Sequence, residues 1–378
     1  TGRVPDENYA REVMQLFSIG LQQLNDDGSV KQANGAALET YTPADIAGLA
    51  KVFTGFSWTC PDWPDNGCFS NGSLGGVSDP DRWIKPMVGY PQHHSTEEKV
   101  FLSANISAQT QSDPNASLKT ALDTLYNHPN VGPFIGKQLI QRLVTSNPSP
   151  GYIQRVGQAW STSGGDLGRV LRAILLDGEA RTAPAAGDAT FGKPREPLLR
   201  IAHLWRAYEA RYVPPASGAL RFRAGSTADL ALSIAQDSQR APSVFNFFEP
   251  DYRIPTSDGS QGVYAPELQI VNESTFTTGH NQSDALLWNY ASTSAPAANT
   301  NAPVLDITRL VQLAEAGDDA AMVQDVNLLL HGGSLPAASA ATLTRMLGSL
   351  RAQGRGASER ARSLLLVALL SPDYAVQR

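Results

Sequence analysis

The residues best suited to chemistry lie in one stretch that mixes carboxylates with aromatic rings. Paired carboxylates suit a cleft that cleaves sugars, because one carboxyl group can act as an acid while the other acts as a base or nucleophile. Surface loops commonly have the same composition without any ligand, so both interpretations stay open. The stretch supplies two candidates for catalysis, Glu249 and Glu267, and two for ligand binding, Tyr252 and Tyr264; its other carboxylates are Asp251, Asp258 and Glu273.

Three further residues are candidates for proton transfer. Glu12 lies in a predicted first helix beside an apolar stripe, where it is either a cleft carboxylate with a raised pKa or a member of a structural salt bridge. His93 and His94 are adjacent, so their side chains diverge and are unsuited to binding one metal together. Either histidine alone could act as a general base or metal ligand, and the alternative is an ordinary hydrogen-bonded loop histidine.

Two cations precede another predicted helix. Lys193 and Arg195 could hold an anionic ligand together with the free N–H groups of that helix start. They could equally attach the preceding linker to the body of the protein.

The chain has two cysteines, Cys60 and Cys68, which flank a short segment rich in Pro, Asp and Gly. We expect them to form a disulfide, because this segment has no apolar pattern that would bury a free thiol. A disulfide is typical of an oxidising compartment. Asp62 and Asp65 in the same loop are weak candidates for calcium, although no EF-hand spacing is present. No zinc site and no other cofactor is predicted.

Composition and missing motifs exclude several classes of function. The net charge is -6, which argues against nucleic-acid binding, and the longest strongly apolar run, 364–370, is far below the ~20 residues of a membrane span. The chain contains no phosphate-binding loop, dinucleotide fingerprint, Gly-x-Ser-x-Gly elbow or His-Glu-x-x-His motif.

Apolar residues recur at helical spacing through most of the chain, which predicts a mainly α, multi-helical globular body with long irregular loops and at most a few short β-strands. In the first helix the predicted apolar face includes Tyr9, Val13, Phe17 and Leu21. We expect an N-terminal helical part, 1–180, containing the disulfide loop, and a C-terminal helical part, 181–378, containing the aromatic and acidic insertion. The two parts could also form one continuous domain.

Several segments resemble a large bacterial family, the domain of unknown function 1800. These are PDENYAREVMQLF (5–17), YTPADI (41–46), TGF (54–56), His94 with EKVFL (98–102), HP (128–129) before FI (134–135), KPREP (193–197), APSVFN (241–246), NLLL (327–330) and LSPDYAVQR (370–378). The loop with Cys60 and Cys68 and the stretch 251–288 are longer than in the short forms of the family.

The resemblance implies a helical protein, often exported, whose relatives usually carry a further helical segment before the position of Thr1. It supplies no catalytic residues, because the family has no agreed activity. The sequence therefore favours an extracytoplasmic binding or assembly component that works with a partner protein or with such an upstream segment. The alternative is a hydrolase or lyase acting on an extracellular polysaccharide or another polymer through acidic residues.

Overall fold

The computed structural model describes residues 4–70, 76–182, 184, 188, 190–213, 234–256, 261–294 and 303–377. The sequence also predicts a short helix at 226–235, which lies almost entirely outside these residues. The chain packs as two compact units. Unit 1 comprises residues 1–140 and 149–181, and unit 2 comprises residues 141–148 and 182–378. The sequence suggests a boundary at 180/181 between an N-terminal and a C-terminal helical part. That domain boundary stays a prediction.

In its described residues, unit 1 contains helices and three small antiparallel strand pairs. Its elements are α1 (Asn8–Gln15), β1 (Gln32–Ala33), β2 (Ala36–Ala37), α2 (Pro43–Val52), β3 (Phe56–Ser57), the 3-10 turn η1 (Gly67–Ser70), β4 (Val88–Gly89), η2 (Pro91–His93), β5 (Lys99–Phe101), β6 (Ala104–Ile106), α3 (Pro114–Tyr126), α4 (Val131–Leu143), α5 (Pro150–Ser163), α6 (Leu167–Leu175) and α7 (Gly178–Arg181). The pairs are β1–β2, β3–β4 and β5–β6, and the end of α4 belongs to unit 2.

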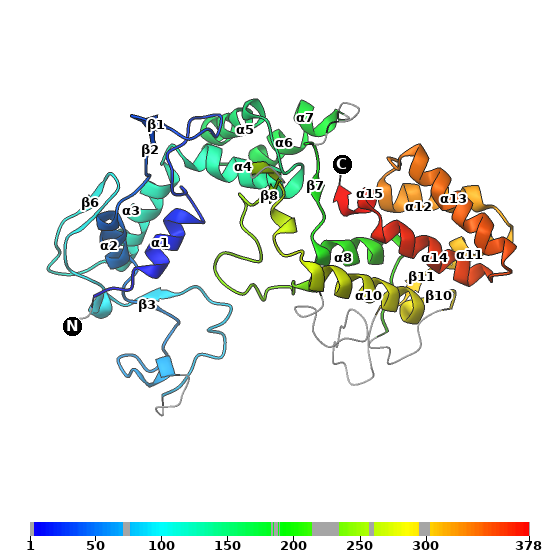
Figure 1. Cartoon of the computed structure of the whole chain (residues 1–378). Helices are drawn as coiled ribbons and strands as arrows, with labels where there is room; N and C mark the ends of the chain where they lie inside the picture. The colour runs from blue at the N-terminus through cyan, green and yellow to red at the C-terminus, as the bar shows by residue number, and fades with distance from the viewer. Residues whose placement is uncertain are drawn as a thin grey trace. The chain divides into compact units, whose positions relative to one another are not determined.

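The described residues of unit 2 form a group of helices with three more short strand pairs. Its elements are β7 (Lys193–Pro194), α8 (Pro197–Ala207), β8 (Arg253–Pro255), β9 (Gln261–Tyr264), η3 (Pro266–Leu268), α10 (Glu273–Tyr290), β10 (Ala291–Ser292), β11 (Leu305–Asp306), α11 (Thr308–Glu315), α12 (Asp319–His331), α13 (Ala337–Ala352), α14 (Ala357–Leu370), α15 (Pro372–Ala375) and β12 (Val376–Gln377). The pairs are β7–β12, β8–β9 and the parallel β10–β11. The predicted mainly helical fold with a few short strands is confirmed (Figure 1).

Local sequence signals explain where many helices begin. Thr42 and Asp45 form a reciprocal capping box at the start of α2, with Pro43 in the first turn. The side chain of Ser149 caps α5 by accepting a hydrogen bond from the backbone N–H of Tyr152, and Asp166 caps α6.

The apolar face predicted for the first helix is partly wrong. Tyr9, Phe17 and Leu21 are exposed, whereas Ala10 and Met14 are buried. The helix ends at Gln15, so Phe17 and Leu21 lie beyond it and do not share a helical face with the residues of α1.

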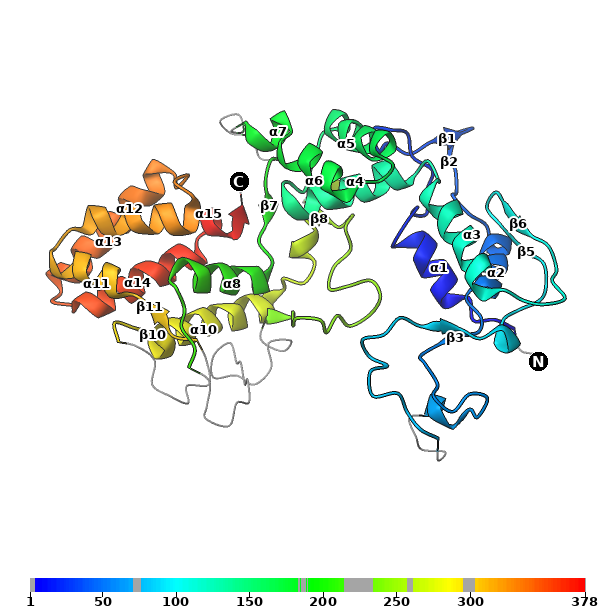
Figure 2. The same ribbon diagram turned by 180° about the vertical axis from the view of Figure 1, so that it is seen from behind.

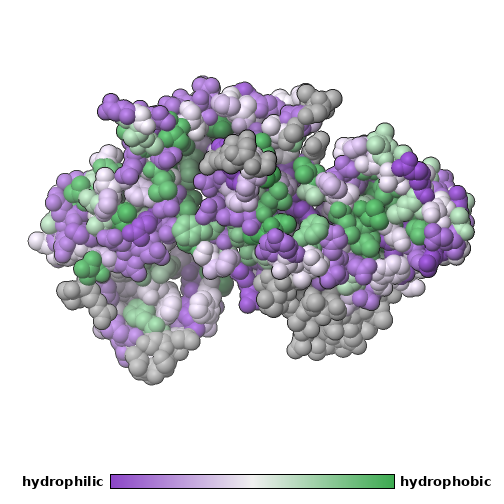
Figure 3. Space-filling model, in the orientation of Figure 1, coloured by the Kyte–Doolittle hydropathy of each residue, from purple (hydrophilic) through white to green (hydrophobic). Residues whose placement is uncertain are grey.

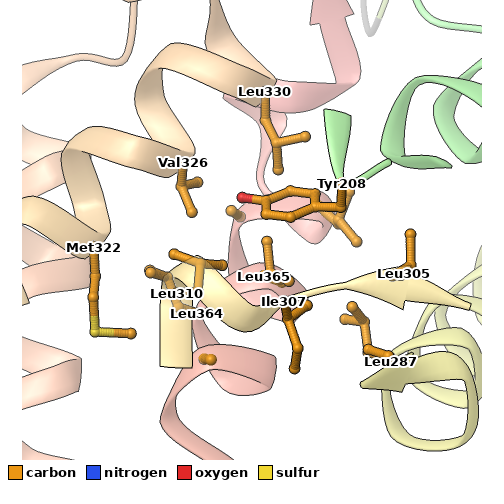
Figure 4. Packing of buried hydrophobic residues seen from close by; sticks show 14 of the residues in the cluster. Tyr208, Leu287, Leu305, Ile307, Leu310, Met322, Val326, Leu330, Leu364 and Leu365 are labelled. Carbon is orange, nitrogen blue, oxygen red and sulfur yellow. The ribbon is translucent and has the colours of Figure 1, made fainter. Parts of the chain in front are cut away.

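Each unit has its own hydrophobic core. In unit 1 the cluster is Ala10, Met14, Ile19, Ile46, Leu49, Ala50, Val52, Phe101, Ala121, Leu125 and Val131. In unit 2, α14 contributes Leu364 and Leu365 to a larger cluster that also contains Tyr208 and residues of α11 and α12 (Figure 4). Figures 1 and 2 both show α8 and α10 side by side, and Ile201 and Leu286 join these helices in a separate small cluster.

Candidate ligand-binding site

A pocket in unit 1 lies where the end of α3, the start of α4 and one face of α5 meet. Its volume is about 470 Å³, which falls within the range of small-molecule sites, roughly 300–1,000 Å³. We call it the unit 1 pocket. It is lined by Asp26, Tyr126, Asn127, His128, Pro129, Gly132, Pro133, Gln154, Gly157, Gln158, Trp160, Ser161, Gly164 and Gly165.

Glycines let the backbones around the pocket approach closely. A Cβ on Gly132 would lie 3.3 Å from the carbonyl oxygen of Gly157, so α4 and α5 meet there without intervening side chains. After α5 the chain turns through Gly164 and Gly165, which both have positive φ. The Tyr126 hydroxyl donates a hydrogen bond to the carbonyl oxygen of Gly164, which connects the end of α3 to this turn.

Two aromatic rings form the apolar part of the lining. The ring centroids of Tyr126 and Trp160 are 5.6 Å apart, and the ring planes are inclined at 49°. Both rings remain partly accessible. They can therefore offer an apolar surface to a ligand.

One face of α5 supplies the polar part of the lining. Gln154, Gly157, Gln158 and Ser161 follow at the spacing i, i+3, i+4 and i+7, which places them on one side of the helix. Gln154 and Gln158 are exposed, and their carboxamides have no hydrogen-bond partner among the described residues. Both carboxamides are therefore available to a ligand.

The protonation of His128 is set by its surroundings. Burial lowers its pKa, and the charge of Lys31 acts in the same direction. The backbone N–H of Asn130 donates a hydrogen bond to Nδ1 of His128 over 3.2 Å. The neutral ring therefore carries its proton on Nε2, which can serve as a donor.

Asn130, which directly follows the lining residue Pro129, holds the loop that carries Asp26. Its buried side chain donates to the carbonyl oxygens of Ile19 (2.8 Å) and Gln22 (2.7 Å) and accepts from the backbone N–H of Leu24 (2.9 Å). This fixes the segment before Asp26 to the start of α4.

Several of the sequence-predicted site residues lie elsewhere in unit 1. Glu12 is buried in α1, with one carboxylate oxygen lacking a hydrogen-bond partner in the described part of the chain. His93 is exposed, with its ring 5.5 Å from that of Trp63. His94 is buried between the carbonyl oxygen of Thr54 (2.9 Å) and the hydroxyl of Ser117 (3.0 Å), and burial lowers its pKa.

Cys60 and Cys68 form a disulfide. Asp62 and Asp65 accept hydrogen bonds from the backbone N–H groups of Val77 and Gly67, respectively. Within the described residues, no group of three or more His, Cys, Asp or Glu side chains is placed to hold a metal ion. A calcium site in this loop stays a prediction.

Unit 2 brings Lys193 and Glu267 together. Their side chains are 3% and 2% exposed, and Nζ lies 3.7 Å from a carboxylate oxygen. Nζ also donates to the carbonyl oxygen of Arg142 over 2.7 Å. Burial lowers the pKa of Lys193 and raises the pKa of Glu267. Such perturbed groups occur at functional sites and also in structural ion pairs.

The other candidates in unit 2 make structural contacts. Arg195 donates to the carbonyl oxygens of Leu330 (3.2 Å) and Tyr374 (3.1 Å). Glu249 is exposed. The backbone carbonyl of Tyr252 accepts from the N–H of Ala265, and Tyr264 lies under the guanidinium of Arg253 at 3.9 Å. Asp258 lies outside the described residues.

The sequence patterns assigned none of the residues that line the unit 1 pocket to a small-molecule site. One usable signal was a polar stripe interrupted by glycine along one side of the predicted helix, formed by Gln154, Gly157, Gln158 and Ser161. The adjacent pair Gly164 and Gly165 gave another. Neither signal indicates which residues of α3 or α4 complete the pocket, because those contacts depend on tertiary packing.

Fold and pocket define a mainly helical protein with a ligand-sized site in its N-terminal unit. The chain belongs to the family described as "Protein of unknown function (DUF1800)", whose model matches residues 1–376. The match covers essentially the whole chain, which confirms the resemblance that the segments from 5–17 to 370–378 indicate. No curated protein and no solved structure matches the chain.

Proposed function

We propose that this chain is a binding protein that holds a small polar ligand in the unit 1 pocket without converting it. The chemistry of the lining supports this proposal. Asp26 is its one carboxylate among the described residues. Glycoside cleavage normally needs two carboxyl groups ~5–10 Å apart.

The alternative is a hydrolase or lyase acting on an extracellular polymer, and it has less support. Glu12 is buried in α1, and His94 is buried between Thr54 and Ser117. Within unit 2, Glu249 is exposed and Glu267 is buried against Lys193. A substrate could reach Glu267 only if the surrounding chain moved.

The disulfide supports a location outside the cytoplasm, since such bonds persist mainly in oxidising compartments. None of the helices in the described ranges has the length and apolar character needed to cross a bilayer. Alkylating free thiols in freshly lysed cells, followed by mass spectrometry, tests the location. We expect Cys60 and Cys68 to remain unmodified, and modification of both in native material would contradict an extracytoplasmic location.

We also propose that the chain works with a partner protein, which contacts exposed apolar side chains in α1 and in the segment directly after it. Tyr9, Phe17 and Leu21 are 58%, 57% and 55% exposed. Hydrophilic and hydrophobic residues are interspersed over the face of the protein drawn in Figure 3. A Phe17→Ser variant should lose co-purification of the partner from the native source and keep its melting temperature. Retained co-purification would contradict this surface.

The binding proposal is tested with the purified chain and a panel of neutral oligosaccharides, free amino acids, choline and inorganic phosphate. Titration calorimetry reports binding, and chromatography of each compound after incubation reports conversion. We expect saturable binding of at least one compound, no product, and weakened binding in Trp160→Ala. Product formation that is lost in Glu267→Gln would support the hydrolase alternative, and failure of every compound to bind would contradict the proposal.

A further inference from the structure

The unit 1 pocket has no strong positive charge in its lining. The described lining residues include neither lysine nor arginine. Burial keeps the pKa of His128 low, so its ring is neutral near neutral pH. Recognition of phosphate or carboxylate groups normally relies on charged donors such as arginine or lysine. An anionic ligand is therefore disfavoured.

The polar groups of the pocket match hydroxyl groups. A carboxamide offers both a donor NH₂ and an acceptor oxygen, and a hydroxyl also donates and accepts. Gln154 and Gln158 present two such carboxamides one helical turn apart on α5. Asp26 adds an acceptor and the Nε2–H of His128 adds a donor. The lining can therefore pair with several neighbouring hydroxyls of one ligand.

The aromatic groups of the pocket match the C–H faces of a sugar ring. Trp160 is half-buried and Tyr126 is 44% exposed, so each ring offers part of its surface. Their centroids lie 5.6 Å apart, and the two rings pack on each other. A cage for a quaternary ammonium group instead arranges ring faces around the cation. This arrangement is therefore better suited to a flat apolar face than to a cation.

Contacts within the protein hold the framework of the pocket in place. Gly132 and Gly157 hold α4 against α5, the Tyr126 hydroxyl is bonded to the turn at Gly164, and Asn130 holds the loop before Asp26. A preformed site reduces the ordering cost of binding. Weak individual contacts with hydroxyls can then sum to a useful affinity.

We infer that the unit 1 pocket binds a neutral saccharide, with Trp160 and Tyr126 packing against the sugar ring and Gln154, Gln158, Asp26 and His128 bonding to its hydroxyls. This inference rests on the proposed binding function and names its ligand class. Gln158 is the residue that we expect to set specificity, because its exposed carboxamide lies one helical turn from that of Gln154.

The test uses the whole chain on an array of neutral glycans, followed by calorimetry with the best free oligosaccharide. We expect binding that weakens roughly tenfold in Trp160→Ala, equivalent to about 1.4 kcal/mol. Gln158→Ala should weaken binding several-fold and change the ranking of glycans. Trp83→Ala and Gln312→Ala are matched controls, because these side chains are exposed and do not line the pocket.

The outcomes separate this inference from the proposed function. Circular dichroism and melting curves identify a variant that fails to fold, and Gln158→Ala removes only an exposed side chain. If choline, an amino acid or phosphate binds at this pocket and no neutral glycan does, the saccharide inference is overturned while the binding function stands. Glycan binding that is unchanged in both Trp160→Ala and Gln158→Ala also overturns it. If nothing binds, both fail.

Discussion

Gly132 and Gly157 bring α4 and α5 into backbone contact, since a Cβ on Gly132 would meet the Gly157 carbonyl oxygen at 3.3 Å. The lining residues of α5 follow from this contact, because Gln154, Gln158 and Ser161 share a face with Gly157. The close packing of α4 against α5 therefore leaves the polar side chains of α5 lining the pocket.

The turn after α5 should distinguish two neighbouring glycines. Gly164→Ala and Gly165→Ala both place a Cβ on a residue with positive φ, which costs about 1–2 kcal/mol. A Cβ on Gly165 would also overlap the Tyr126 hydroxyl, whereas one on Gly164 meets nothing within 4 Å. We expect Gly165→Ala to lose an additional ~1–3 kcal/mol of unfolding free energy in urea titrations. Equal losses would contradict the close contact.

Asn130→Ala should strongly destabilise unit 1. It leaves the carbonyl oxygens of Ile19 and Gln22 and the N–H of Leu24 without their partner, at a site where the asparagine is 1% exposed. We expect a loss of about 2–4 kcal/mol, measured by urea unfolding. Asn127→Ala is the control: it removes an exposed carboxamide that donates one hydrogen bond to the carbonyl oxygen of Asp123, and it should cost no more than ~1 kcal/mol. Similar losses in the two variants would be the adverse result.

The Arg155–Asp177 pair should make stability depend on acid. Arg155 donates to both oxygens of Asp177, at 2.7 and 2.8 Å, and this bonding lowers the pKa of Asp177 below its ordinary 3.8. A depressed carboxyl pKa stabilises the fold above the unfolded value, and this contribution is lost as the pH falls through the folded value. Because Arg155 is half exposed, Asp177→Asn should cost only about 1 kcal/mol at neutral pH.

Melting curves from neutral to strongly acidic pH check this prediction. The difference between wild type and Asp177→Asn should shrink below pH 3.8. A difference that stays constant down to strong acid would show that the carboxylate charge contributes nothing.

The buried pair of unit 2 should behave as one structural element. Lys193→Met leaves the Glu267 carboxylate buried without its ammonium partner, so we expect a loss of about 3–5 kcal/mol. The double variant Lys193→Met/Glu267→Leu removes both charges and should recover much of that loss. A double variant that is no more stable than the single one would contradict this account.

Glu267 alone should give the opposite pH trend to Asp177. Burial raises its folded pKa above the ordinary 4.5, so the folded state binds more protons than the unfolded state between those two values. The unfolding free energy of the wild type should therefore fall, relative to Glu267→Gln, as the pH rises above 4.5. Calorimetric melting across this range measures the difference, and a rise with pH would contradict it.

Local signals predicted much of the secondary structure. The Thr42–Asp45 capping box and the Ser149-Pro150 start of α5 were readable because each depends on residues within one helical turn. The first helix was harder, because its apolar residues continue past Gln15 where the helix ends. Tyr9, which the apolar pattern placed on the buried face, is largely exposed and contacts the ring of Phe53 edge-on, with the ring centroids 4.7 Å apart.

The sequence by itself determined the helical character of the chain and the pairing of Cys60 with Cys68, the only two cysteines available. Periodicity, caps and a short loop are properties of neighbouring residues, so no distant contact is needed to read them. Tertiary structure alone decided that Asp26, Tyr126 and Gln158 line one pocket and that Lys193 meets Glu267. Those encounters depend on which helix faces pack together, and many pairings of apolar faces are compatible with the same local pattern.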